Sequence, residues 1–272
     1  MSELEDKLSD WEAYRMAAKK EDLKPTLNTV KIDKEKASIV PLGDTHIGSR
    51  YFDESLLKEN LEWCVENDAR IILMGDMIET ATRDSVGAGV YEQDEIVDTQ
   101  LEHFYHLFRP VVDEGIVLGL HPGNHEMRIY KSAGLNISKQ MSKELKIPYL
   151  GWGKLHYLRV GNQRYTMYTT HGSSGARLPH TKIKGALDLA NLADAEIYAM
   201  GHLHQLSHHI RNFYKPDLRA KKVSEEQKHF LLCGAYLNHW GSYGHIKNYE
   251  PVRKGSPKIK LHGDKHKIRV SL

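Results

Sequence analysis

Short apolar runs alternate with polar stretches through the first half of the chain. Three of the runs are rich in branched apolar residues and too short for helices, which predicts buried strands at residues 37–42, 70–74 and 115–120. Between them, 53–67 and 92–108 carry apolar residues at helical spacing. We expect the second helix to end at Arg109-Pro110, because proline disrupts a helix interior.

The second half of the chain is richer in strand patterns. Alternating residues on both sides of Gly161-Asn162 predict a hairpin of 154–160 and 164–170. Further strands are expected at 195–200, 206–214, 228–233, 258–261 and 267–270, helices at 132–145 and 179–192, and an exposed polar loop at 215–227. We therefore predict an α/β sandwich, with parallel strands first and a more antiparallel sheet after them.

The start of the chain has a different pattern. Residues 2–20 place apolar side chains near helical spacing, and Pro25 lies just beyond, where such a helix is expected to end. We take residues 1–36 as an N-terminal helical extension and 37–272 as one domain. The extension is expected to pack on the core or to mediate an oligomer contact, and contact with substrate is the second interpretation.

Composition favours a water-soluble protein. Hydrophobic residues make up 40% of the 272 residues, which is enough for a packed core, and the mean hydropathy is −0.55. No apolar stretch approaches the roughly 20 residues of a membrane span, and the acidic first residues lack the apolar core of a signal peptide. The two cysteines, Cys64 and Cys233, lie far apart. We therefore expect a reduced, cytoplasmic protein without membrane contact.

Charge is distributed unevenly behind a net charge of +2. Residues 50–114 contain 5 Lys or Arg against 16 Asp or Glu, whereas residues 128–184 contain 11 Lys or Arg and one acid, Glu144. Such blocks usually mark faces that are solvated differently. The basic block also fits a surface that attracts a polyanion.

Five polar blocks follow mostly strand-like runs, and each has a glycine beside its polar side chains. They are Gly43-Asp44-Thr45-His46, Gly75-Asp76, Gly123-Asn124-His125-Glu126, His171-Gly172 and Gly201-His202-Leu203-His204. Ligands of α/β sheets sit beyond the carboxyl ends of the strands, so we expect the five blocks to converge. The glycines suit tight turns, which often need positive φ or close backbone approach.

The side chains of these blocks fit a site for two divalent metal ions. They comprise two aspartates, one amide and four histidines: Asp44, Asp76, Asn124, His46, His171, His202 and His204. Two ions about 3.5–4 Å apart can clamp a phosphoryl group and share one hydroxide. Mixed imidazole and carboxylate ligands suit Mn²⁺, Fe or Zn²⁺ better than Mg²⁺ or Ca²⁺, and Mn²⁺ is our first choice.

The ordered set resembles the calcineurin-like metallophosphoesterase superfamily, whose pattern is D-x-H, G-D, G-N-H-[DE], H and G-H-x-H. The resemblance covers residues 39–204 and implies a four-layer α/β sandwich, with two mixed β-sheets flanked by helices. It implies two ligand sets joined by a bridging carboxylate, which are Asp44, His46 and His204, then Asn124, His171 and His202, with Asp76 between them. It also implies that a metal-bridging hydroxide attacks phosphorus.

The third block holds two further residues with expected roles. The resemblance leaves His125 off the metals and makes it the catalytic residue that faces the substrate. There it would orient the phosphate or protonate the leaving oxygen. Glu126 is expected to support the site rather than to bind a metal.

Two details of the motifs bear on the substrate. The second block continues as Met77-Ile78-Glu79-Thr80, without the Asp-Arg-Gly found in protein serine/threonine phosphatases of the superfamily. The first block, Asp44-Thr45-His46-Ile47-Gly48, is similar to the D-x-H-[LI]-G opening of SbcD-type DNA repair nucleases. We therefore predict a phosphodiesterase that acts as a DNA or RNA nuclease. A phosphomonoesterase or small-molecule phosphodiesterase is the main alternative, and a non-enzymatic scaffold is the third.

Basic residues near the blocks are candidates for contact with a phosphodiester substrate. Arg50 follows the first block, Arg128 the third and Arg177 the fourth. Such residues would bind the phosphates of a nucleic acid without reading its sequence. Each is also an ordinary surface charge, so the sequence leaves both interpretations open.

Overall fold

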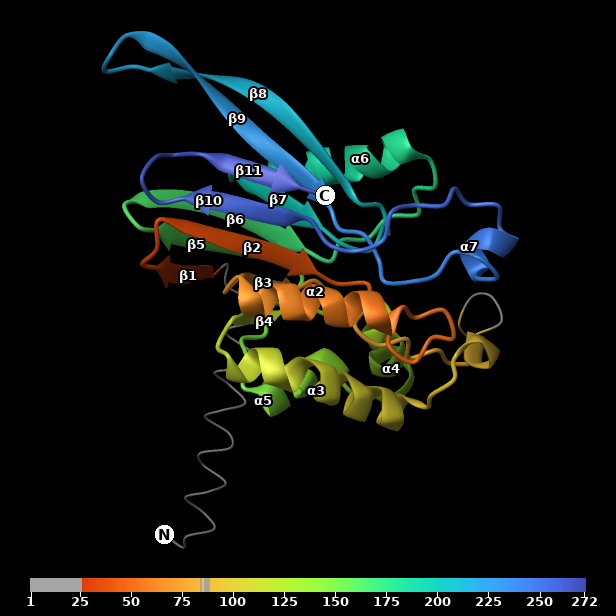
Figure 1. The fold of residues 1–272 in the computed structure, drawn as a ribbon. Helices are drawn as coiled ribbons and strands as arrows, with labels where there is room; N and C mark the ends of the chain where they lie inside the picture. Colours follow the sequence, from red (N-terminus) through yellow and green to blue (C-terminus); the bar gives the residue numbers. More distant parts are fainter. Residues whose placement is uncertain (1–25, 84, 86–88) are drawn as a thin grey trace, which may run out of the picture.

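The computed structural model describes residues 26–83, 85 and 89–272. Its strands form two sheets that lie face to face, with helices on both outer sides (Figure 1). The helix expected at residues 2–20 lies outside the described residues.

The larger sheet has six strands in the order β1-β5-β6-β7-β9-β8. Their bounds are β1 Leu27–Ile32, β5 Lys154–Val160, β6 Gln163–Thr170, β7 Ile197–Met200, β9 Lys222–Leu232 and β8 Ser207–Asp217. The neighbours β6, β7 and β9 run parallel, while β5–β6 and β8–β9 are antiparallel pairs. The sheet is therefore mixed, and the predicted hairpin at residues 154–170 is confirmed.

The smaller sheet has five strands in the order β11-β10-β2-β3-β4. Their bounds are β11 Ile268–Ser271, β10 Lys258–His262, β2 Lys36–Leu42, β3 Arg70–Leu73 and β4 Val117–Leu120. The three central apolar runs of the first half form the parallel strands β2, β3 and β4, as predicted. Strand β10 pairs antiparallel with both β2 and β11, so this sheet is mixed as well.

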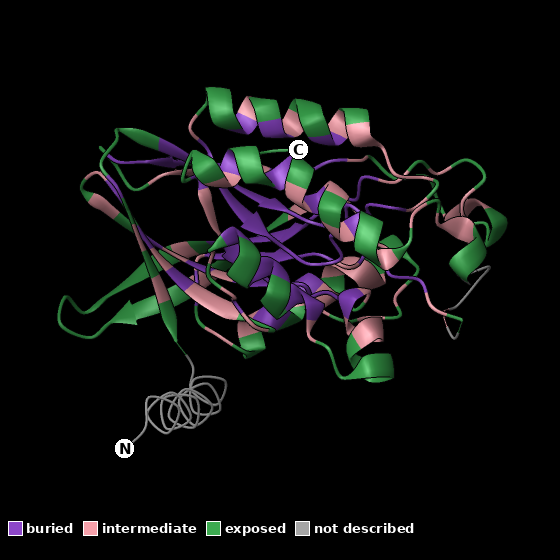
Figure 2. Ribbon diagram, turned by 90° about the horizontal axis from the view of Figure 1, so that it is seen from below, coloured by how far each residue is buried: buried purple, intermediate pink, exposed green. Residues whose placement is uncertain are grey.

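Helices cover both outer faces of the pair of sheets. Their bounds are α2 Glu54–Glu66, α3 Val97–Asp113, α4 Glu126–Ala133, α5 Ile137–Leu145, α6 Pro179–Asp188 and α7 Tyr243–Ile246, with 3₁₀ turns at Gly89–Glu92 and Leu189–Asn191. Apolar residues of α2, α3 and α5 pack on the smaller sheet, and those of α6 pack on the larger one. Figure 2 shows helices α2, α3 and α5 with exposed outer faces over buried strands.

A third apolar cluster lies between the two sheets. It joins Ile39 and Ile72 of the smaller sheet to Leu158 and Met167 of the larger one, and all four are fully buried. Burial of such side chains stabilises the fold by roughly 1.5–3 kcal/mol each. The observed order is helix, sheet, sheet, helix, which confirms the predicted four-layer α/β sandwich.

The expected boundary at residue 36 is wrong. Residues 27–32 form β1, which pairs in parallel with β5 at the edge of the larger sheet. The strand was missed because only one of its side chains, Ile32, is fully buried, so it lacks a clear apolar run. The described part of the expected extension therefore belongs to the sandwich.

Three further elements differ from the prediction. Helix α3 continues past Pro110 to Asp113, because Phe108 and Val111 on the same face pack on the sheet. The single helix expected at 132–145 is two helices, separated at Gly134, whose φ is +69°.

The polar segment at 215–227 extends strands β8 and β9 instead of forming a loop. Backbone pairing continues to Asp217 and Lys222 although the side chains there are exposed. A strand ladder needs only its N–H and C=O groups to pair, so polar composition did not prevent it.

Among the described residues, no helix is both long and apolar enough to cross a membrane.

A buried chain of hydrogen bonds ties the two sheets together near the strand ends. Thr169 Oγ1 lies 2.7 Å from Nε2 of His156 and 2.7 Å from Nε2 of His121, and all three residues are fully buried. His121 Nδ1 donates to the Gly151 carbonyl oxygen at 2.6 Å, so its Nε2 accepts from the Thr169 hydroxyl. His156 Nε2 then donates to Thr169, and Asn28 Nδ2 donates to His156 Nδ1 at 3.2 Å. With both rings neutral, all four ring nitrogens and the Thr169 hydroxyl are paired.

Burial supports this neutral state. It lowers the pKa of His121 to about 4 and that of His156 to about 3. Because each folded-state pKa lies below the usual value near 6.5, the unfolded chain binds more protons as the pH falls. The contribution of these rings to stability is therefore complete above pH 6.5 and is lost progressively toward pH 4.

We predict that Thr169→Val lowers the free energy of unfolding by about 1–3 kcal/mol. The substitution keeps the shape of the side chain but leaves two buried imidazole nitrogens without a partner. Urea denaturation at pH 7.5 measures the effect. Thr29→Val, at an exposed position of β1, is the control and should change stability by less than about 0.5 kcal/mol. Equal effects of the two substitutions would contradict the proposed chain.

Candidate metal centre

The five polar blocks meet at one end of the sandwich. Strands β2, β3 and β4 are parallel, so the residues that follow them lie side by side at the carboxyl edge of the smaller sheet. Strands β6 and β7 are parallel too, and they deliver His171 and the His202–His204 turn. The first block also contacts the segment that follows β9, since Tyr236 N donates to the Asp44 carbonyl oxygen at 3.0 Å. The two sheets therefore bring all five blocks to a common site.

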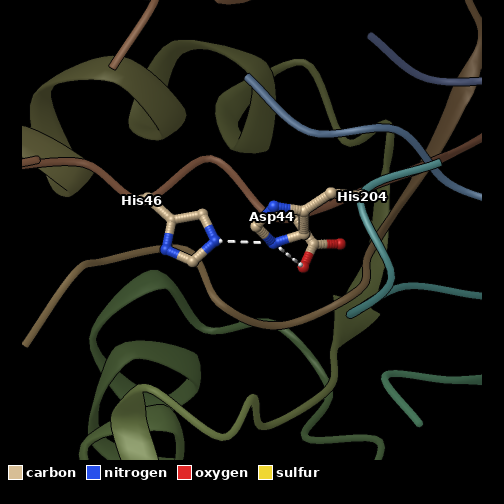
Figure 3. Close-up of side chains that lie close together, drawn as sticks. All are labelled: Asp44, His46 and His204. Atoms are coloured by element: carbon tan, nitrogen blue, oxygen red, sulfur yellow. Dashed lines mark hydrogen bonds and ion pairs between the residues drawn. The ribbon is translucent and has the colours of Figure 1, made fainter. Parts of the chain in front are cut away.

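The first group of side chains is Asp44, His46 and His204 (Figure 3). His46 Nε2 and His204 Nε2 are 3.1 Å apart, and His204 Nε2 lies 3.3 Å from Asp44 Oδ1. One ligand atom of each residue lies within 4.8 Å of the other two. Asp44 and His46 are buried, while the side chain of His204 is 34% exposed. The group therefore opens to solvent on the His204 side.

The second group is Asp76, His171 and His202, whose ligand atoms also lie within 4.8 Å of one another. Asn124 joins it, because its Oδ1 is 2.6 Å from His202 Nδ1 and 3.0 Å from His171 Nε2. His171 Nε2 also lies 3.3 Å from Asp76 Oδ2. The structure thus brings together the residues that the sequence assigned to each of the two sites. The bridging role of Asp76 stays a prediction.

Hydrogen bonds fix which nitrogen of three histidines faces the centre. His46 Nδ1 donates to Glu79 Oε2 at 3.0 Å, His171 Nδ1 to the Met74 carbonyl at 2.9 Å, and His202 Nε2 to the Ser174 carbonyl at 3.0 Å. These acceptors are oxygens, so each ring keeps its proton on the outer nitrogen when neutral. The inner nitrogens then present lone pairs to the centre, as metal-binding histidines do.

The electrostatics of the centre suit a cation. Burial raises the pKa of Asp76, but the charges of His171 and His125 outweigh burial and hold it well below its usual value. Burial lowers the pKa of His171, but Asp76 outweighs it and raises the pKa to about 10. A proton on His171 Nε2, which faces Asp76, therefore offsets the charge of the buried carboxylate. A bound cation would offset the same charge. Metal binding would release such a proton.

Five of the seven expected ligands have backbone conformations that non-glycine residues rarely adopt. Their φ values are 51° for Asp44, 51° for His46, 50° for Asp76, 68° for His202 and 50° for His204. A non-glycine residue in such a sparsely populated region costs on the order of 1–3 kcal/mol and persists only where its surroundings hold it. Strain concentrated on the candidate ligands points to a functional site.

Glu126 joins the second and third blocks through hydrogen bonds to their backbone N–H groups. Its buried carboxylate accepts N–H bonds from Gly123 at 2.9 Å, Asp76 at 3.1 Å, Met77 at 2.7 Å and Ile78 at 3.2 Å. Gly123 has to be glycine, because a Cβ there would lie 2.1 Å from the Asp76 backbone nitrogen. Glu126 thus supports the loops, and it belongs to none of the groups of candidate ligands found among the described residues.

His125 lies beside both groups without belonging to either expected ligand set. Its Nδ1 donates to the Glu79 carbonyl at 2.8 Å, and its Nε2 lies 2.8 Å from Arg128 Nη2 and 3.8 Å from Asp76 Oδ2. Burial lowers its pKa, but Asp76 and Glu79 outweigh burial and raise it to about 9. The guanidinium can only donate, so it favours the neutral ring. This nitrogen therefore faces one hydrogen-bond donor, Arg128, and one ionised carboxylate, Asp76, which favour opposite protonation states, as suits a group that takes up and releases a proton.

Glu79 is a site residue that the sequence analysis did not single out. Its carboxylate contacts His46 at 3.0 Å, His125 at 3.3 Å and Arg128 at 3.2 Å, and it forms a third group of candidate ligands with the two histidines. The signal was its place three residues after Asp76. Only the fold shows that it turns toward His46 and His125.

The three candidate substrate arginines lie in different surroundings. Arg128 is beside His125, as described. Arg50 is exposed and pairs with Asp94 at 3.2 Å, and no hydrogen bond or ion pair found among the described residues joins it to the ligand groups. Arg177 lies over the ring of Tyr249, 5.6 Å from its centroid. Only Arg128 therefore touches the centre directly.

The donor set fits divalent transition-metal ions. Two compact groups each combine a buried carboxylate with two imidazoles, and the amide of Asn124 adds an oxygen. Imidazole nitrogen suits Zn²⁺, Fe and related ions, while carboxylate and amide oxygen suit Mn²⁺. The residues could therefore hold two such ions.

No protein-family profile matches the sequence, and no curated protein matches it either. Similar solved structures include a conserved uncharacterized protein from Streptococcus pneumoniae TIGR4, described as a predicted phosphoesterase, with 14% identity, coverage of 87% of this chain and 98% of that chain, and a TM-score of 0.36. Vacuolar protein sorting 29 from Cryptosporidium parvum has 15% identity, coverage of 88% and 98%, and a TM-score of 0.42.

Wild-type Vps29 from Entamoeba histolytica, complexed with Zn²⁺, has 12% identity, coverage of 86% and 97%, and a TM-score of 0.37. At TM-scores this low the likenesses carry no argument. What can be said of the centre therefore rests on its own side chains.

We predict that His204→Gly is more stable than His204→Ala by about 1 kcal/mol when both are measured with excess chelator. Both substitutions remove the imidazole, but glycine adopts the φ of 50° without strain. Urea denaturation gives the difference. The same pair at His209, an exposed residue of β8, is the control. At His209 the glycine variant should be less stable than the alanine variant, because glycine weakens a strand. The same order at both positions would contradict strain at His204.

Proposed function

We propose that the chain is a phosphodiesterase that depends on two divalent metal ions and acts on DNA or RNA. The observation that carries the proposal is the pair of adjoining imidazole–carboxylate groups, whose inner ring nitrogens are set toward the centre by outer hydrogen bonds. Such a pair matches the requirement for clamping a phosphoryl group between two cations.

Each group has a role in this proposal. Asp44, His46 and His204 would hold one ion, and Asn124, His171 and His202 the other, with Asp76 between them. Bound ions supply positive charge that offsets the charge developing on the phosphoryl oxygens, and they make water nucleophilic near neutral pH. Mn²⁺ is our first choice because the ligands mix oxygen and imidazole nitrogen.

The protein's own groups would handle the proton and orient the ester. His125 would give a proton to the leaving oxygen, since its Nε2 lies at the edge of the centre between Arg128 and Asp76. Glu79 would position His125 and His46, because its carboxylate contacts both rings. The Arg128 guanidinium would bind a non-bridging phosphate oxygen.

A nucleic-acid substrate is supported by three features of the sequence. The first block is similar to that of SbcD-type nucleases, and the second lacks the Asp-Arg-Gly of the related protein phosphatases. The basic segment at 128–184 contains one expected ligand, His171, so positive charge lies along the chain next to that ligand. Phosphate contacts of this kind attract a polyanion without sequence preference.

A phosphomonoesterase or small-molecule phosphodiesterase is the second candidate. The observation that favours it is Arg128, whose forked guanidinium beside His125 would suit the doubly charged end of a monoester.

Parallel hydrolysis assays with Mn²⁺ separate the candidates. The substrates are single-stranded DNA, duplex DNA, RNA, bis-p-nitrophenyl phosphate and p-nitrophenyl phosphate, each with a chelator-treated control. We expect cleavage of the diesters and loss of activity with chelator. Hydrolysis of the monoester alone would overturn the proposal in favour of the second candidate.

Substitutions in the centre should separate metal binding from proton transfer. Asp76→Asn should lose bound metal and nearly all activity, whereas His125→Ala should keep the metal and lower kcat by roughly 10²–10⁴-fold. Metal content by mass spectrometry and steady-state kinetics give the two readouts. His209→Ala, on the exposed strand β8, is the control. Unchanged turnover of His125→Ala would remove its role, and full metal content in Asp76→Asn would contradict the ligand assignment.

A further inference from the structure

A small hollow lies beside the candidate metal centre. It has a volume of about 220 Å³, and its lining includes three basic side chains, Arg177, Lys182 and Arg253, together with Gln205 and Tyr249. Pockets for drug-sized ligands usually measure roughly 300–1,000 Å³, so this one suits a smaller group.

Two segments that carry expected ligands also line the hollow, and a third segment completes it. Gln205 directly follows His204 in the chain. The loop from His171 leads to Arg177, and within it the Ser174 carbonyl accepts from His202 Nε2 at 3.0 Å. The segment containing Arg253 is anchored by Gly255 N, which donates to the Ala235 carbonyl at 3.0 Å. The hollow is therefore continuous with the turns that carry the expected ligands.

The hollow has an excess of positive charge. Glu250 is the acid in its lining, against three bases. Within the described part of the chain, Arg177, Lys182 and Arg253 form no ion pair, while Arg50, Arg70, Arg109 and Arg128 each do. Arg177 instead lies over the Tyr249 ring. Burial lowers the pKa of Lys182, and Glu250 opposes that shift. A concave site in which basic side chains outnumber acidic ones suits an anionic ligand.

Gln205 adds a polar group that lacks a partner. Its Oε1 is buried and makes no hydrogen bond with the described residues. A buried amide oxygen without a partner costs about 1–3 kcal/mol. A ligand that supplies a donor, such as a hydroxyl, would satisfy it.

We propose that this hollow binds a second phosphate of the substrate, next to the one cleaved at the metal centre. The inference rests on the proposed function and narrows its substrate class to phosphodiesters with at least two phosphates, as in a nucleic acid strand. Arg177 and Arg253 bind the phosphate oxygens through charge-assisted hydrogen bonds. Gln205 Oε1 accepts a hydrogen bond from an N–H group of the strand, such as the N3–H of a thymine base. Substrates with one phosphate leave the hollow unused.

The test compares a substrate with several phosphates to one with a single phosphate. The ratio of kcat/KM for hexathymidylate to that for bis-p-nitrophenyl phosphate is measured with Mn²⁺ in wild type and in Arg177→Ala/Arg253→Ala. We expect the ratio to fall by about tenfold or more, since each lost charged hydrogen bond weakens transition-state binding. Arg219→Ala/Lys221→Ala is the control. It removes the same charge from the turn between β8 and β9, at the end of the molecule opposite α7 (Figure 1).

A binding measurement without catalysis gives the second readout. Fluorescence anisotropy follows fluorescein-labelled hexathymidylate in chelator between 50 and 200 mM salt. The association constant falls with salt, so the plot of its logarithm against log salt concentration has a negative slope. In Arg177→Ala/Arg253→Ala the magnitude of this slope should decrease by about 0.7, as expected for one lost phosphate contact on a single strand. The control should keep the wild-type slope.

The outcomes separate this inference from the proposed function. An unchanged ratio and slope in Arg177→Ala/Arg253→Ala, or an equal loss in the control, would overturn the second phosphate site while diester hydrolysis by wild type still stands. A smaller slope in that variant, with no diester cleaved by wild type, would support the phosphate site and overturn the proposed function.

Discussion

Backbone N–H groups fix both buried aspartates of the centre, and the rest of the site depends on this. Both oxygens of Asp44 accept from His202 N at 3.0 Å, which ties the first block to a turn from the other sheet. Asp76 Oδ1 accepts from His125 N at 2.8 Å. A buried carboxylate is costly unless it is hydrogen-bonded or paired. These bonds therefore lock the loops of both sheets into one arrangement before any ion binds.

This locking also explains why the strain falls on the ligands. The turns have to leave two sheets and aim five polar side chains inward within a few residues, and positive φ achieves this. The surroundings that hold the strain are the Glu126 carboxylate beneath the second and third blocks and the apolar cluster between the sheets. Such a site trades folding stability for a preformed arrangement of donors.

The apolar runs and the polar blocks were predictable because each depends on a short, continuous stretch of residues. Buried strands need continuous apolar residues, and ligand blocks follow them with a glycine. Strand β1 and the outer half of the β8–β9 hairpin were not predictable, because backbone pairing holds them while their side chains stay largely exposed. The position of Glu79 beside His125 depends on how β3 and β4 align, which the sequence does not show. The positive φ of His204 could not be predicted either, because histidine is not a residue type that indicates positive φ.

The proposed chemistry requires the two groups of side chains to bind two metal ions. Diffraction from crystals grown with Mn²⁺, recorded at the manganese absorption edge, tests it most directly. We expect two anomalous peaks about 3.5–4 Å apart. One should lie against Asp44, His46 and His204, and the other against Asn124, His171 and His202. A single peak at the centre, or peaks only elsewhere, would contradict it.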